Sequence, residues 1–154
     1  MTMATVEMSF TPLPAHVRTA RLVATAVARR SGVDEALLDE VRLAVGEACS
    51  RAVEAHQEHC PAEPVRVALT GANGRFEVVV TDTAAQRATP GSMENGRGTP
   101  GHGRPAVAGD AGQLAVPAEL GLAVIEGLAD DVEIAHTDAG LSIRMSWPSS
   151  AAAS

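Results

Sequence analysis

Residues 37–56 read LLDEVRLAVGEACSRAVEAH, and their spacing predicts a long amphipathic helix. Asp34, just upstream, is a good N-cap residue for its start. The apolar positions of this helix form one stripe, made of Leu37, Leu38, Val41, Val45, Ala48 and Ala52. At about 100° per residue, a second face gathers Glu40, Glu47, Arg51 and Glu54. The stretch therefore predicts a helix that buries one side and holds a cluster of charges well away from it.

The flanking segments predict strands that come mostly in hairpins. Residues 5–10 alternate apolar and polar side chains, as in a half-buried strand, and residues 16–30 form a helix that Gly32 ends. Two alternating runs around Gly71-Ala72-Asn73-Gly74 predict a β-hairpin through Phe76 to Val80. The later elements are expected to be a helix over 119–129 and two strands over 132–136 and 141–147.

This order, β-α-α-β-β-long loop-α-β-β, predicts an α+β fold. We expect a two-layer sandwich with an antiparallel or mixed sheet and the helices on one face. One face of each hairpin is polar, which suits a sheet that is covered on one side only.

A long segment over residues 83–118 shows no periodicity and holds seven glycines and four prolines. Such a segment inside a compact domain is typically a functional lid or disordered, and we interpret it as a lid. The sequence thus predicts one domain over residues 1–148 with this lid, and a disordered tail over 149–154.

Composition excludes several function classes. The 154 residues carry a net charge of −7, and every basic residue is Arg, because the chain has no Lys. The missing Lys excludes a Walker A loop or the usual kinase lysine, and the acidic charge argues against nucleic-acid binding. Two cysteines do not make a disulfide framework, and no apolar run is long enough for a membrane span. We therefore expect a cytoplasmic protein with no membrane contact.

Four segments, taken in order, resemble one known family. Residues 43–53 (LAVGEACSRAV) resemble the N-box of the GHKL ATPase fold, and more narrowly that of the anti-sigma-factor serine kinases of Gram-positive bacteria. The resemblance continues at 78–82 (VVVTD), 119–125 (ELGLAVI) and 128–134 (LADDVEI). It covers nearly the whole chain and implies the two-layer GHKL, or Bergerat, architecture.

The resemblance also implies a nucleotide site, from which this sequence departs. The family places Glu and Asn four residues apart on the N-box helix, where the Glu acts as base and the Asn holds Mg²⁺. Glu47 is kept, but Arg51 stands at the Asn position, and a guanidinium has no lone pair to offer a metal. Asp82 matches the Asp that reads the adenine amino group, although the two glycines that follow it in the family are absent. Of the glycine box before the last helix, only Gly121 remains.

The candidate ligand-binding residues are Glu47, Arg51, Asp82 and Gly121. The lid adds Arg97, His102 and Arg104, whose side chains would either bind a phosphate group or stay solvated. Glu47 would be catalytic only in an active kinase. Glu47 and Arg51 have three interpretations: an ordinary surface pair worth about 0.3–0.5 kcal/mol, a pair facing the ligand, or a pair whose Arg51 fills the pocket as an internal cation in place of the metal.

Two further positions have alternative interpretations. Asp82 would either cap the following loop or read a base. His56, His59 and Cys60 have ligand-like spacing for zinc, but no fourth ligand is evident and cations suit a helix C-terminus. We expect no metal there.

The resemblance implies an anti-sigma factor that binds an alternative sigma factor of the stress or sporulation type. It also implies a homodimer, and release by a STAS-domain anti-anti-sigma antagonist. With the Mg·ATP site altered, the pocket would hold either an anionic, phosphorylated ligand bound by Arg51 and the lid, or no ligand. The alternatives are an active ATP-dependent serine kinase acting on the STAS partner, and a metabolite sensor with no sigma partner.

Overall fold

The computed structural model describes residues 4–84, 118–138 and 140–150. Its elements, in chain order, are β1 (Ala4–Phe10), α1 (Pro14–Arg30), the 3-10 turn η1 (Glu35–Leu37), α2 (Leu38–His59), β2 (Val65–Ala72), β3 (Arg75–Asp82), α6 (Ala118–Leu128), β4 (Asp131–Thr137) and β5 (Gly140–Pro148). The predicted order of strands and helices is confirmed, with boundaries that differ by a few residues. Most of the predicted lid lies outside the described residues.

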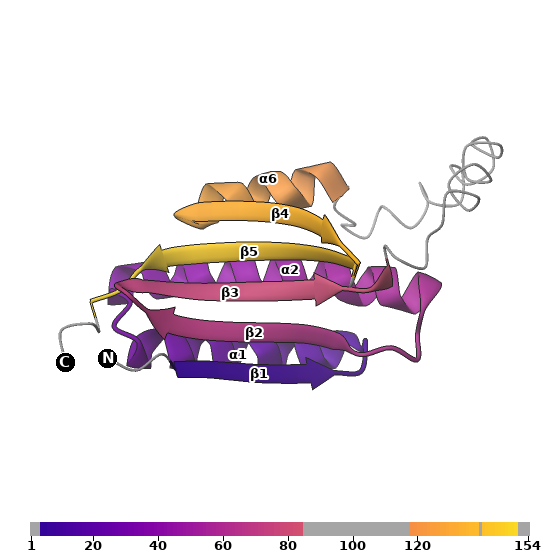
Figure 1. The fold of residues 1–154 in the computed structure, drawn as a ribbon, viewed down its shortest axis with the longest axis horizontal. Helices are drawn as coiled ribbons and strands as arrows, with labels where there is room; N and C mark the ends of the chain where they lie inside the picture. The colour runs from indigo at the N-terminus through magenta and orange to yellow at the C-terminus, as the bar shows by residue number, and fades with distance from the viewer. Residues whose placement is uncertain (1–3, 85–117, 139, 151–154) are drawn as a thin grey trace.

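The five strands form one antiparallel sheet in the order β1-β2-β3-β5-β4, and the helices lie on one face of it (Figure 1). The α+β two-layer sandwich is therefore confirmed, and of the two predicted sheet types the antiparallel one is correct. The pair β4–β5 joins the sheet at β3, so the last hairpin of the chain lies beside the middle one.

The register shows how alternation makes the core. One row across the sheet contains Met8, Val67, Val80, Ile143 and Ile134, each opposite the next. The three middle residues of this row are almost completely buried, whereas Ile134 on the edge strand is 37% exposed. The core is thus deepest under β2, β3 and β5, where α1 and α2 cover the sheet.

The other sheet face is polar and carries a charge cluster. Arg144 on β5 donates to Glu77 on β3, with 3.0 Å between Nε and Oε2, and also forms an ion pair with Glu133 on β4. These three side chains lie on neighbouring strands of the uncovered face, which suits contact with water.

Two turns have the glycines that their backbone requires. Gly32 ends α1 at a φ of 93°, where its N–H bonds to the carbonyl of Arg29 and the N–H of Val33 bonds to that of Ala28, as in a Schellman motif. Asn73 and Gly74 both have positive φ, which is the geometry of a two-residue hairpin turn. Both predicted stops are confirmed.

The end of the chain is held more tightly than predicted. The N–H of Ser149 bonds to the carbonyl of Gly74 at 2.8 Å, and the N–H of Ser150 bonds to that of Gly32 at 3.0 Å. The expectation of disorder from residue 149 is therefore wrong for these two serines, because two turns offer them carbonyl partners. Residues 151–154 lie outside the described residues. Across the described ranges, no helix has both the length and the apolar character that crossing a bilayer requires.

Candidate functional site

Glu47 and Arg51 lie one turn apart on α2, on the side that faces α6. The helix buries its apolar stripe against the sheet, from Leu38 to His56, which leaves this side for contact with the next helix. Both side chains are partly buried, and the Nε atom of Arg51 is fully buried. The two residues therefore lie at the contact with α6, where Gly121 comes close to both of them.

Helix α6 contacts Glu47 and Arg51 at Gly121. A Cβ atom built on Gly121 would lie 2.6 Å from Oε2 of Glu47 and 3.2 Å from Cδ of Arg51. Real Cβ contacts are almost never this short, so the missing side chain is what lets the two helices approach. The structure thus brings together three of the residues that the sequence predicts for the site.

Asp82 is the last residue of β3 and lines the same hollow as Arg51. Its Oδ1 accepts a hydrogen bond from the backbone N–H of Ala84 at 2.7 Å and lies 3.3 Å from Nε2 of His56. Its side chain is only 15% exposed. Of the two predicted roles, loop capping is therefore observed, and this carboxylate already has partners within the chain.

His56, which the sequence presents only as a candidate zinc ligand, has a structural role that the sequence pattern did not identify. It is fully buried, Nδ1 lies 2.9 Å from the carbonyl of Glu63, and Nε2 lies 3.1 Å from the backbone N of Thr83. The carbonyl requires a proton on Nδ1 and the N–H requires a lone pair on Nε2, so these partners assign the neutral tautomer. The available signal was its place on the apolar stripe, four residues after Ala52.

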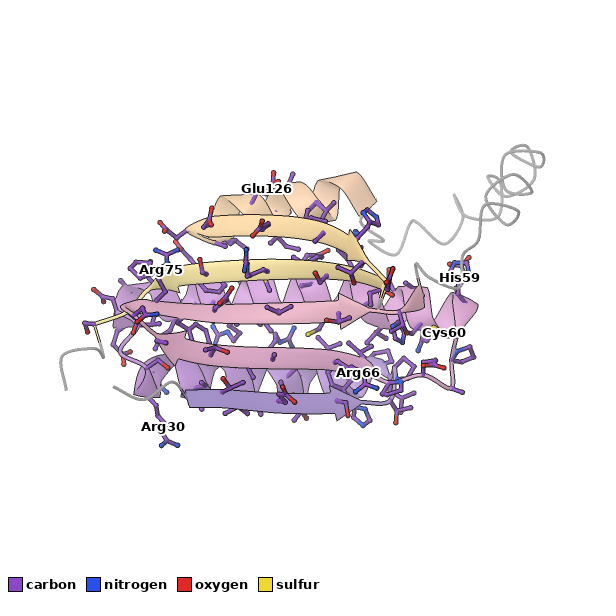
Figure 2. The ribbon with its side chains drawn as sticks, viewed as in Figure 1. Arg30, His59, Cys60, Arg66, Arg75 and Glu126 are labelled. Atoms are coloured by element: carbon purple, nitrogen blue, oxygen red, sulfur yellow. The ribbon has the colours of Figure 1, made fainter. Side chains whose placement is uncertain are left out.

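With both ring nitrogens engaged, His56 has none left for zinc. His59 and Cys60 lie nearby at the end of α2 (Figure 2), where His59 is partly exposed and Cys60 is buried. Within the described parts of the chain, no group of three or more His, Cys, Asp and Glu side chains is arranged to hold a metal ion.

The space between these residues is small. Arg51, Asp82, Ala48, Ala52, Val80, Leu141 and Ile143 line a hollow of about 10 Å³. This is about the room that a single water molecule occupies. The GHKL family implies Mg²⁺ and ATP here, but among the described residues the donors do not fit that group, because a guanidinium, which has no lone pair for a metal ion, stands at the metal-ligand position.

A larger hollow of about 370 Å³ lies on the uncovered sheet face, over Glu7, Ser9, Arg66, Ala68 and Thr81. It lies on the opposite face of the sheet from Glu47 and Arg51, so size alone does not identify the site. We place the candidate site at the contact of α2, α6 and β3, where the sequence-predicted residues converge. Arg97, His102 and Arg104 lie outside the described residues.

Cys49 lies between Glu47 and Arg51 in the sequence, on the buried side of α2. Burial raises the pKa of its thiol to about 12, and the charge of Arg21 opposes this shift. Gly46 makes room for that arginine, whose Cδ would lie 2.7 Å from a Cβ at position 46. The Cys49 thiol therefore stays protonated and unreactive, as expected of a packed small hydrophobe.

Fold and site together define a known class of domain. The model of the histidine kinase-like ATPase domain matches residues 10–147, and the chain belongs to this family. Among solved structures, it is similar to the RsbU and RsbW domains of Rv1364c from Mycobacterium tuberculosis, with a TM-score of 0.63 and 16% sequence identity. The likeness covers 95% of this chain and 32% of that one, so this chain spans about a third of its length. No curated protein matches the sequence.

Proposed function

We propose that this chain is an anti-sigma factor that sequesters an alternative sigma factor of the stress or sporulation type. The observation that carries the proposal is the close contact of Glu47 and Arg51 with Gly121, in a chain that belongs to the ATPase family. A fold that is kept while an arginine stands at the metal-ligand position supports a function in protein binding. The similarity to a structure that contains an RsbW domain supports the same class of function.

Helix α1 has the surface that such binding needs. It carries Arg18 and Arg30 on its exposed side and no acidic residue, in a chain whose net charge is −7, while Arg29 pairs with Glu35. Leu22 on this helix is 60% exposed, and Leu43 on α2 is 55% exposed, the two highest values among the large hydrophobic residues described. An apolar anchor flanked by arginines suits a partner segment that carries carboxylates around an apolar side chain.

The proposal includes the partners that the family resemblance implies. A STAS-domain antagonist would compete with the sigma factor for this chain, and the outcome would follow their affinities and concentrations. A homodimer and an anionic ligand at Arg51 stay predictions.

Binding measurements with purified partners test the proposal. We expect one alternative sigma factor from the native cell to bind the chain by titration calorimetry, and a STAS-domain protein to displace it. Leu22→Glu should weaken that binding at least about tenfold, because it places a charge at a buried interface anchor. Arg66→Glu is the matched control, since Arg66 lies on the uncovered face of the sheet (Figure 2). Failure of every such sigma factor to bind would refute the proposal.

The active serine kinase is the alternative, and a transfer assay separates it from the proposal. The chain is incubated with labelled ATP, Mg²⁺ and the STAS-domain protein. We expect no labelled protein, because the metal-ligand position holds Arg51. Label transfer that Glu47→Ala abolishes would establish the kinase instead.

A further inference from the structure

The contact between α6 and α2 depends on Arg51 in a way that needs no bound ligand. Its Cδ and one terminal nitrogen would lie 3.2 and 3.6 Å from a Cβ on Gly121, so its side chain runs along the α6 backbone. Its other side lines the 10 Å³ hollow with Asp82. One side chain therefore touches α6 and also occupies the space between α2 and β3.

The other groups around this space are already engaged. Asp82 accepts from the N–H of Ala84, and His56 beside it bonds to Thr83 and Glu63. On the α6 side, Oε2 of Glu47 is the atom nearest to the Gly121 position. A permanent cation thus lies between two carboxylate-bearing residues, where an incoming metal ion would meet both a filled space and a like charge.

We propose that the Arg51 guanidinium is a built-in substitute for the metal-bound nucleotide, which fills the site and holds α6 against α2. The chain then keeps one closed arrangement whether or not nucleotide is present. Which protein partner the chain binds would then depend on the affinities and concentrations of the partners, and not on the concentration of ATP. This inference does not depend on which partner the chain binds.

The fold supplies an optical reporter of the α6 position. Trp147 is the only tryptophan of the chain, it is buried, and its indole N–H donates to the carbonyl of Leu128 at 3.1 Å. Leu128 is the last residue of α6. When α6 leaves its place, the indole loses this partner and gains water, so its emission shifts to longer wavelength.

The test combines this emission, hydrogen exchange of the α6 amides, and titration calorimetry. For the wild-type chain with millimolar Mg·ATP, we expect no binding heat, no emission shift and unchanged exchange. For Arg51→Ala without nucleotide, we expect the α6 amides to exchange about tenfold faster, because local opening becomes easier, together with a red shift. Arg42→Ala is the matched control on the same helix, where Arg42 pairs with Asp39 at the surface.

Two results would overturn the inference: submillimolar binding of Mg·ATP by the wild-type chain, or equal α6 exchange in Arg51→Ala and Arg42→Ala. If Arg51→Ala does not fold, Arg51→Gln keeps most of the stem and removes the charge, and Arg42→Gln is then its control. The inference and the proposed function share the contact at Gly121, but their failures are distinguishable, because sigma-factor binding is measured directly with purified partners and these two results are not.

Discussion

The Nε2 atom of His56, fully buried at the end of α2, accepts a hydrogen bond from the backbone N–H of Thr83, just beyond β3. Through Nδ1 the same ring reaches the carbonyl of Glu63, in the connection between α2 and β2. One imidazole therefore joins three segments at the edge of the candidate site and fixes where Asp82 lies.

Replacing this ring should cost much of the stability of the chain. His56→Ala leaves a buried N–H and a buried carbonyl without a partner and opens a cavity, so the free energy of unfolding should fall by about 2–4 kcal/mol. Urea unfolding measures the change. His59→Ala, on the exposed side of the same helix end, should change it by less than about 0.5 kcal/mol. Equal effects of the two variants would contradict the bridging role of His56.

The two glycines of α6 should respond in opposite directions to alanine. Nothing lies within 4 Å of a Cβ at Gly127, so Gly127→Ala should stabilise the helix by about 0.5–1 kcal/mol. At Gly121 the new methyl group would clash with Glu47 and Arg51. The free energy of unfolding of Gly121→Ala should therefore be about 1–2 kcal/mol lower than that of Gly127→Ala. Thermal unfolding of the two variants compares them, and equal stabilisation would mean that α6 does not rest on the pair.

A second glycine pair separates backbone strain from steric clash. Gly140 and Gly74 both have positive φ, at 125° and 76°. A Cβ on Gly140 would lie 2.3 Å from the carbonyl oxygen of Asp82, whereas one on Gly74 would be 3.7 Å from its nearest neighbour. Gly74→Ala should cost about 1–2 kcal/mol for its conformation alone, and Gly140→Ala should cost clearly more in urea unfolding. The reverse order would show that β4–β5 is not seated against the end of β3.

The buried Cys49 thiol should make the chain less stable in alkali. Its folded pKa of about 12 lies above the value of 9.0 for an exposed thiol, so between these pH values the unfolded chain has lost a proton that the folded chain retains. Its contribution is complete below pH 9 and falls by about 1.4 kcal/mol per pH unit above it, up to about pH 12.

This slope is measurable because the chain has neither Lys nor Tyr to titrate in the same range. Urea unfolding at pH 8 and pH 10 should show the loss in the wild-type chain and not in Cys49→Ala, with Cys60→Ala as the comparison for the other thiol. The same alkaline loss in Cys49→Ala would assign it to another group.

Local sequence patterns were enough to predict most of the helices and strands, but not the contacts between elements that are distant in the sequence. The alternation around Val67 and Val80 and the turn at Asn73-Gly74 identify their strands directly, because side-chain direction and turn geometry are local properties. The position of β5 beside β3 depends on Val80 meeting Ile143, more than 60 residues away, which no local pattern encodes.

The candidate site divides in the same way. The predicted residues Glu47, Arg51 and Gly121 do meet, and Asp82 shares a hollow with Arg51. The carboxylate of Asp82 accepts a hydrogen bond from Ala84 and lies beside His56. Both contacts depend on the path of the chain after β3, so the sequence alone could not decide between loop capping and base reading.

The first strand and the last serines meet at one end of the molecule. Ala4 of β1 lies opposite Gly71, and Ser149 bonds to Gly74 in the next turn of the chain, whereas Asp82 lies at the opposite end of β3. A probe placed on Ser149 would therefore report on the end of the sheet opposite to the hollow that Arg51 and Asp82 line, and close to the last residue of α6, whose carbonyl bonds to Trp147.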